Sequence, residues 1–412
     1  MAQLTVVYWR DIPAQVTVKA GRKNAKVQLS ERFEKAIDRA AMRAKLTGTD
    51  AYLEHWRRGA WSATTTTSGC APSWLPAVQR QRQRKTPRHD ARRRNPGMYA
   101  VNKAMQLDPA AEQTKQQILD LVRDFTVETT PGSAAKIPDY REHLRPGARV
   151  AVTFLPGSDF ADTVATAKRL QEEGFEPMPH FAARSIPSRE ALEDYLKALA
   201  DVTELKHVVA LAGAVDQPLG PFDSSMAILE TGLFDKYGVE TIGVAGHPEG
   251  SPDISPAALA EALAWKNAFA ERSDAKLYIA TQFCFEAAPI IAWDKAMQAA
   301  GNRLPIHIGV PGLATIKTLI NHAKACGVGP SMRFLTRQAR NVAKLMTVNA
   351  PDKLLLDLAR YKALDPDCGI ARVHIYPLGG LKRSAAWTYA VADGDFELNA
   401  KGKGFTVTRP IE

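Results

Sequence analysis

Short apolar runs recur along the chain from residue 98 to its end. There are eight such runs, each four to seven residues long and each ending in small or polar residues. Continuous apolar runs of this length are typical of strands buried on both faces, as in a parallel sheet. The predicted strands span residues 125–128, 149–154, 176–180, 207–213, 241–246, 277–283, 306–310 and 373–376.

Amphipathic helix patterns fill most of the gaps between these strands, with apolar residues three or four positions apart. Eight strands alternating with helices are the count of a (β/α)8 TIM barrel, so we predict an α/β fold of this kind. A doubly wound open sheet is the alternative, but it usually shows fewer strands and a glycine-rich first turn. The predicted helices span 163–173, 188–200, 257–270, 287–300, 316–325, 331–346 and 350–364.

The first sixty residues predict a separate small α/β domain. Two runs rich in β-branched residues, 4–9 and 16–20, indicate strands, and Gly21–Asn24 has the composition of a turn. Ser30 is the expected cap of a helix whose apolar face includes Ile37 and Ala40. Residues 51–56 are expected to form a last helical turn.

Residues 61–97 show no apolar period. A stretch rich in threonine and serine is followed there by a run of glutamine and arginine. We interpret this segment as a basic linker between a domain at 1–60 and a catalytic barrel at 98–412. A tail for nucleic acid or an acidic partner is one alternative, and a locally shifted reading frame is another.

The charge of the chain is concentrated in this linker. The formal net charge is +10, but Arg80–Arg94 alone holds eight basic residues and one acid, a net +7. The remaining 397 residues therefore carry only +3. A binding surface for nucleic acid is accordingly not expected on the body of the protein.

Composition narrows the class of protein further. A chain with 45% hydrophobic and 24% charged residues is typical of a globular protein. No apolar run reaches the roughly 18 residues that a membrane helix needs, and the N-terminus has no secretory pattern. The four cysteines are far apart, which favours reduced thiols over a disulfide framework or a zinc site. We expect a cytoplasmic protein with no membrane partner, and make no prediction of its oligomeric state.

Few charged residues follow the predicted strands, and in a barrel the active site lies at these strand ends. Glu128 ends the first strand, His180 the third and His247 the fifth, while Gln282 lies among aromatic residues at the end of the sixth. Such a set suits a flat, conjugated ligand, with Glu128 transferring a proton. A structural role for Glu128 or His180 is the alternative.

Taken in order, the strand ends resemble the methylenetetrahydrofolate reductase family over about residues 120–385. The N-terminal unit resembles a short domain known as a virulence-factor domain, which is found fused to such reductases. The segments that carry the reductase resemblance are Phe125–Pro131, His207–Gly213, Ala245–Glu249, Thr281–Glu286, Val310–Gly312 and Val373–Tyr376.

The resemblance implies a TIM barrel that binds FAD noncovalently. In that family NADH or NADPH reduces the flavin, which passes a hydride to 5,10-methylenetetrahydrofolate and gives 5-methyltetrahydrofolate. Glu128 would be the acid that protonates the folate nitrogen, and Gln282, Phe283 and Phe285 would contact the folate. The residues implied to line the flavin are Thr153, His180, Gly213, His247 and Lys266.

The strand end at Ala212–Gly213–Ala214 departs from the family pattern, which has arginine and aspartate beside this glycine. Asp216 is the nearest replacement for the aspartate. A carboxylate beside a flavin disfavours the reduced anion, so its loss is expected to favour oxidation of 5-methyltetrahydrofolate. Two other functions stay open. One is a non-redox folate-binding barrel that partners a methyltransferase, and the other is nucleic-acid association through residues 80–94.

Overall fold

The structure is a computed structural model that describes residues 3–20, 23–28, 37, 40, 55–60, 109–325, 335, 347–399 and 402–411. The chain divides into two compact units, a small N-terminal unit and a larger barrel unit, and each is described by itself. The predicted linker at 61–97 lies outside the described residues, as do Ser30 and most of the predicted helix at 331–346.

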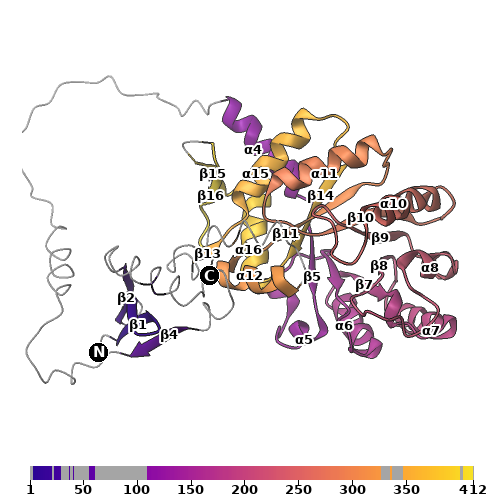
Figure 1. The fold of residues 1–412 in the computed structure, drawn as a ribbon, viewed down its shortest axis with the longest axis horizontal. Helices are drawn as coiled ribbons and strands as arrows, with labels where there is room; N and C mark the ends of the chain where they lie inside the picture. Colours follow the sequence, from indigo (N-terminus) through magenta and orange to yellow (C-terminus); the bar gives the residue numbers. More distant parts are fainter. Residues whose placement is uncertain are drawn as a thin grey trace, which may run out of the picture. The chain divides into compact units, whose positions relative to one another are not determined.

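The barrel unit contains eight parallel strands that close on themselves (Figure 1). Their order around the barrel is β10-β11-β14-β5-β6-β7-β8-β9, so neighbours in sequence are neighbours in space. This confirms the predicted TIM barrel and all eight predicted strands. The strands are β5 (Thr126–Thr129), β6 (Arg149–Val152), β7 (Glu176–Ala182), β8 (His207–Leu211), β9 (Thr241–Gly246), β10 (Lys276–Phe283), β11 (Ile306–Pro311) and β14 (Ile370–Tyr376).

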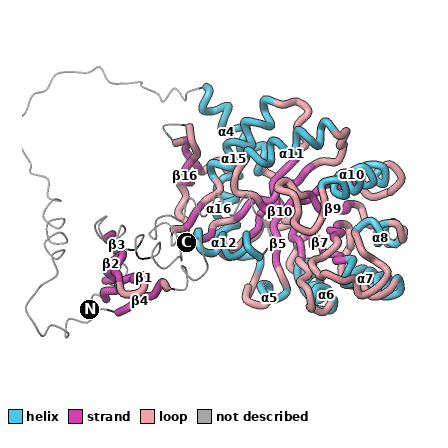
Figure 2. Tube along the Cα trace, viewed as in Figure 1, coloured by secondary structure: helices cyan, strands magenta, loops and turns pink. Residues whose placement is uncertain are grey.

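Helices surround the strands, as Figure 2 shows by colour. The five predicted helices between 163 and 325 are confirmed, and so is the helix expected at 350–364, while α4 and α16 were not predicted. The helices are α4 (Pro109–Val122), α5 (Pro131–Ala134), α6 (Phe160–Glu172), α7 (Arg189–Ala200), α8 (Ser225–Leu229), α9 (Leu233–Lys236), α10 (Pro256–Ala270), α11 (Ala287–Ala299), α12 (Ile316–Ala325), α15 (Asp352–Leu364) and α16 (Leu381–Ala392). Short 3-10 turns, η1 (Tyr140–Glu142) and η2 (Ala183–Ser185), and strand pairs β12 (Ala314–Thr315) with β13 (Val348–Asn349) and β15 (Phe396–Leu398) with β16 (Phe405–Val407) complete the unit.

Local sequence fixes where several of these helices begin. The side chain of Ser188 accepts a hydrogen bond from the Ala191 N–H at 3.2 Å and caps α7. Ser255 caps α10 in the same way, and Pro256 occupies the first turn, where a missing N–H costs nothing. One face of α7 is then buried against the barrel, through Leu192, Tyr195, Leu196 and Leu199.

Strand alternation decides which side chains enter the barrel. Val127 and Val150 belong to the core between strands and helices, whereas Ala151, Met178 and Val209 form a separate cluster. Since Glu128 is in register with Ala151, its side chain lies on the inner face of the sheet.

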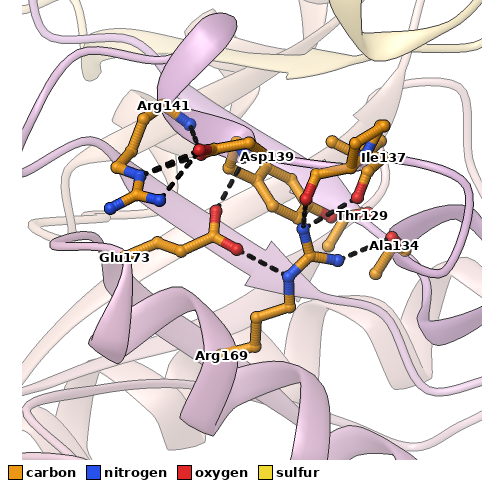
Figure 3. A network of polar contacts seen from close by, with 9 residues as sticks. Thr129, Ala134, Ile137, Asp139, Arg141, Arg169 and Glu173 are labelled. Carbon is orange, nitrogen blue, oxygen red and sulfur yellow. Dashed lines mark hydrogen bonds and ion pairs between the residues drawn. The ribbon is translucent and has the colours of Figure 1, made fainter.

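A polar network holds the connection that follows β5 (Figure 3). The Arg169 guanidinium donates to Glu173 Oε1 at 2.6 Å and to the carbonyl oxygens of Ala134 and Ile137 at 2.9 and 2.7 Å. Glu173 Oε2 in turn accepts from the Tyr140 N–H at 2.7 Å, and the Tyr140 hydroxyl is 2.8 Å from Thr129 Oγ1. The network thus fixes the end of β5, one residue after Glu128.

Replacing Arg169 by methionine is expected to lower the free energy of unfolding by about 2–4 kcal/mol. Methionine fills similar volume but leaves Glu173 Oε1 and the carbonyl oxygens of Ala134 and Ile137 without the donors of Arg169. Urea unfolding monitored by circular dichroism measures the loss. Arg169→Lys keeps the charge without the fork of donors and should lose part of this amount. A loss below about 1 kcal/mol for the methionine variant would contradict this role.

The N-terminal unit is an antiparallel sheet in the order β3-β2-β1-β4, made of β1 (Gln3–Trp9), β2 (Ile12–Ala20), β3 (Lys23–Gln28) and β4 (Trp56–Ala60). Trp9 is fully buried against Ala14 and Ile37, and Ile37 is helical as predicted. The expected helical turn ending at Trp56 is wrong at that residue, because Trp56 begins β4 and pairs with Trp9. Lys23 and Asn24, expected in a turn, begin β3 because their backbone pairs with Ala20 and Lys19.

Among the described residues, no helix is long and apolar enough to span a membrane.

Candidate functional site

Glu128 lies at the C-terminal end of β5 and is held by two neighbouring strands. Its Oε2 accepts a hydrogen bond from Thr153 Oγ1 at 3.2 Å and lies 3.6 Å from His374 Nε2 on β14. The Glu128 side chain is 16% exposed, so it is shielded yet still reaches solvent. The structure therefore brings together two residues predicted for the site, Glu128 and Thr153, and adds His374.

His374 is itself fixed from the opposite side of its ring. His374 Nδ1 is 2.7 Å from the hydroxyl of Thr126, which precedes Glu128 by two residues on the same strand. Both residues are buried, with 2% exposure for Thr126 and 7% for His374. His374 lies in the Val373–Tyr376 segment that carries part of the reductase resemblance, but neither it nor Thr126 was predicted for the site. The alternation of inward positions on β5 was the signal that could have found Thr126.

Two further histidines lie within electrostatic range of the Glu128 carboxylate. Burial lowers the pKa of His180 on β7 to about 4, and the nearby Glu128 charge opposes that shift. Burial also lowers the pKa of His322 on α12, again opposed by Glu128. Glu128 is thus the carboxylate beside three imidazoles from three different elements, and His322 was missed by sequence analysis.

An aromatic chain connects Glu128 with the end of β10. His374 contacts Tyr376 edge to face at 4.9 Å between ring centroids, and Tyr376 contacts Phe283 at 5.2 Å. Phe283 then contacts Phe285 at 5.6 Å. We call the rings of Tyr376, Phe283 and Phe285 the aromatic wall. Phe283 is 1% and Phe285 7% exposed, so both rings are buried. Gln282, next to Phe283 in the sequence, is half-buried.

The end of β10 leaves the regular ladder just where Gln282 lies. The register with β11 shifts between Ala280 and Phe283, and the Tyr376 hydroxyl donates to the Thr281 carbonyl at 2.8 Å. Gly309 on β11 allows the backbone of β10 to lie close to it, because a Cβ at position 309 would be only 2.6 Å from the Thr281 carbonyl oxygen. Gln282 Oε1 accepts from the Phe283 N–H at 3.1 Å, so its amide nitrogen points away from the backbone.

The side of the barrel around β7 and β8 carries small residues. Gly213 has φ +93°, and a Cβ at this position would lie 3.2 Å from the Ala182 methyl group. His180 Nδ1, on the same side, is buried and has no hydrogen-bond partner within the described part of the chain. The small residues Gly213 and Ala182 leave room for a planar ligand, and a polar edge of such a ligand could bond to the unpartnered His180 Nδ1.

Lys266 and His247 lie beside the end of β9. The Lys266 Nζ donates to the Ala245 carbonyl at 2.9 Å, and burial lowers its pKa to about 8. Burial and the nearby Lys266 lower the pKa of His247 to about 4. Lys266 therefore remains a buried cation at pH 7, and an anionic group close to Ala245 would stabilise it.

The departures noted in the sequence lie at the end of β8. Ala214 and Asp216 are both exposed on the connection that follows this strand. Arg184 is bonded to this connection at two points, because its guanidinium donates to the carbonyl oxygens of Asp223 and Val215 at 2.8 and 3.4 Å. In the described residues there is no cluster of three or more His, Cys, Asp or Glu side chains arranged to hold a metal ion.

Comparison with known proteins gives a family match for the N-terminal unit and structural likenesses to solved proteins. A family model described as "Virulence factor" matches residues 7–68, in agreement with the resemblance of the N-terminal unit. A solved structure from Clostridium thermocellum, described as an uncharacterized protein that binds two copies of 5-methyl-5,6,7,8-tetrahydrofolic acid, covers 68% of this chain and 97% of its own. With 12% identity and a TM-score of 0.40, that ligand cannot be transferred to this chain. The reductase resemblance of the barrel stays a prediction.

Proposed function

We propose that the barrel binds a reduced folate and interconverts 5,10-methylenetetrahydrofolate and 5-methyltetrahydrofolate with a bound flavin. The observation that carries this proposal is the position of Glu128. Its carboxyl group lies on the inner face of the barrel at the strand ends, held by Thr153 and beside His374. It adjoins an aromatic wall that suits a pterin ring.

In the reducing direction Glu128 gives its proton to the folate nitrogen whose bond to the methylene carbon breaks. The Glu128 carboxylate that results is stabilised by the Thr153 hydroxyl, which already donates to Oε2. The Gln282 amide nitrogen, directed away from the backbone, would donate to a polar edge of the pterin. The rings of Tyr376, Phe283 and Phe285 would keep the wall behind it rigid.

The residues at the ends of β7, β8 and β9 suit FAD. Gly213, Ala182 and His180 would lie against the ring system, and the buried cation Lys266 would bind a phosphate. When bound, the flavin supplies the hydride transfer. This chain has Ala214 where the family pattern has an aspartate. We therefore propose that hydride transfer from 5-methyltetrahydrofolate to the flavin is the favoured direction.

The absorption spectrum of the purified protein tests the cofactor. Bound flavin gives bands near 370 and 450 nm, and stopped-flow mixing under anaerobic conditions should bleach the 450 nm band with 5-methyltetrahydrofolate. If NADH or NADPH bleaches this band and 5-methyltetrahydrofolate does not, the result would contradict the oxidative direction. A colourless protein that cannot be loaded with FAD but binds folate would instead identify a non-redox folate module.

A further inference from the structure

The two contacts to Glu128 fall on the same carboxylate oxygen. Thr153 Oγ1 and His374 Nε2 both approach Oε2, at 3.2 and 3.6 Å. This leaves Oε1 as the oxygen that can carry a proton to a substrate. The 3.6 Å separation is longer than a hydrogen bond, but such contacts are commonly long before substrate is bound.

The tautomer of His374 follows from its other neighbour. The Thr126 hydroxyl, 2.7 Å from Nδ1, can either donate to this nitrogen or accept from it. Only donation by Thr126 leaves the ring proton of neutral His374 on Nε2, where it faces an oxygen that accepts hydrogen bonds. Both side chains are buried, so water competes poorly for either contact.

On this basis we propose that Thr126 and His374 form a positioning pair for Glu128. The Thr126 hydroxyl donates to Nδ1, the Nε2–H of His374 is directed at Glu128 Oε2, and Oε1 is thereby oriented toward the substrate. This inference rests on the proposed function for its kinetic consequence, but the tautomer itself is a property of the protein without ligand.

The other groups near Glu128 do not replace His374 in this role. His180, on β7, acts on Glu128 only through its charge, and burial keeps it neutral above about pH 4. His322, on α12, likewise has an electrostatic interaction with Glu128. Thr153, directly after β6, shares Oε2 but does not contact Nδ1 or fix the ring.

Two matched substitutions of His374 test the geometry. In His374→Gln the side-chain amide nitrogen reaches the place of Nε2, whereas in His374→Asn it reaches only that of Nδ1. We expect kcat for folate turnover to fall about a hundredfold in the asparagine variant, because a misplaced Glu128 loses its alignment. The glutamine variant should retain at least tenfold more kcat than the asparagine variant, with KM changed less than threefold in both.

The nitrogen chemical shifts of His374 test the tautomer in the protein without ligand. Histidine labelled with nitrogen-15 should show neutral His374 protonated on Nε2, with its signals assigned by their loss in His374→Gln. Thr126→Val should shift the ring toward a mixture of tautomers, and Thr126→Ser should restore the wild-type state. Protonation on Nδ1 in the wild type, or equal kcat of the two His374 variants, would overturn the inference. If His374 carries its proton on Nε2 but the protein does not turn over folate, the positioning pair would stand and the proposed function would be contradicted.

Discussion

Glu128→Gln is expected to lower kcat for folate turnover between a hundredfold and ten-thousandfold while leaving folate binding within a few-fold of wild type. Glutamine has nearly the same shape and can still accept a hydrogen bond from Thr153 Oγ1 through its amide oxygen. It cannot release a proton to the folate nitrogen. The loss should therefore appear in kcat for reduction of 5,10-methylenetetrahydrofolate, measured by steady-state kinetics. It should also appear in the rate at which this substrate reoxidises the reduced flavin in single turnover.

A surface carboxylate provides the matched control for this substitution. Glu172 on α6 has a side chain that is 64% exposed and contacts Lys168 at the surface, so Glu172→Gln should leave kcat unchanged. The alternative for Glu128 is a purely structural acid. In that case Glu128→Gln would lower the thermal midpoint and keep more than a tenth of the wild-type kcat.

The strands of the barrel could be predicted because their information is local. A run such as Ile306–Pro311 is buried at every position, and this pattern is visible in the sequence without knowledge of its neighbours. The position of Glu128 followed from the same reasoning, since the end of a parallel strand in a barrel is the end where ligands bind. The strand Trp56–Ala60 could not be predicted this way, because its pairing partner Trp9 lies 47 residues earlier.

The positioning of Glu128 depends on contacts that are remote in sequence. Thr126 and His374 are 248 residues apart, and only closure of the barrel places β14 beside β5. The burial of Lys266 and of Phe283 is equally non-local, because each depends on how helices and strands that are distant in sequence pack within the barrel. Glu128 could therefore be placed at a strand end from the sequence, whereas the contact of His374 with it could not.

The free energy of unfolding is expected to decrease as the pH falls from about 6.5 toward 4, because buried histidines stay neutral in the folded state. Burial lowers the pKa of His180 to about 4 and that of His307 to about 3. In the unfolded chain each imidazole takes up a proton near pH 6.5. Below that pH the unfolded state binds more protons than the folded state, so stability is full above about pH 6.5 and is lost on acidification. Each of these two histidines should cost about 2 kcal/mol at pH 5 relative to pH 7.

His307→Phe isolates one of these contributions. His307 is stacked on Tyr278 with 4.0 Å between ring centroids, and its Nδ1 is buried with no hydrogen-bond partner among the described residues. Phenylalanine keeps a stacked ring and removes the titrating group, so the loss of stability between pH 7 and 5 should shrink by about 2 kcal/mol. Ile308→Val, on the same strand and also buried, is the control. It should lower the free energy of unfolding by about 0.5–1.5 kcal/mol at both pH values. Urea unfolding at pH 7, 6 and 5 measures both variants. An unchanged pH dependence in His307→Phe would show that His307 takes up its proton at the same pH in the folded and unfolded protein, contrary to this prediction.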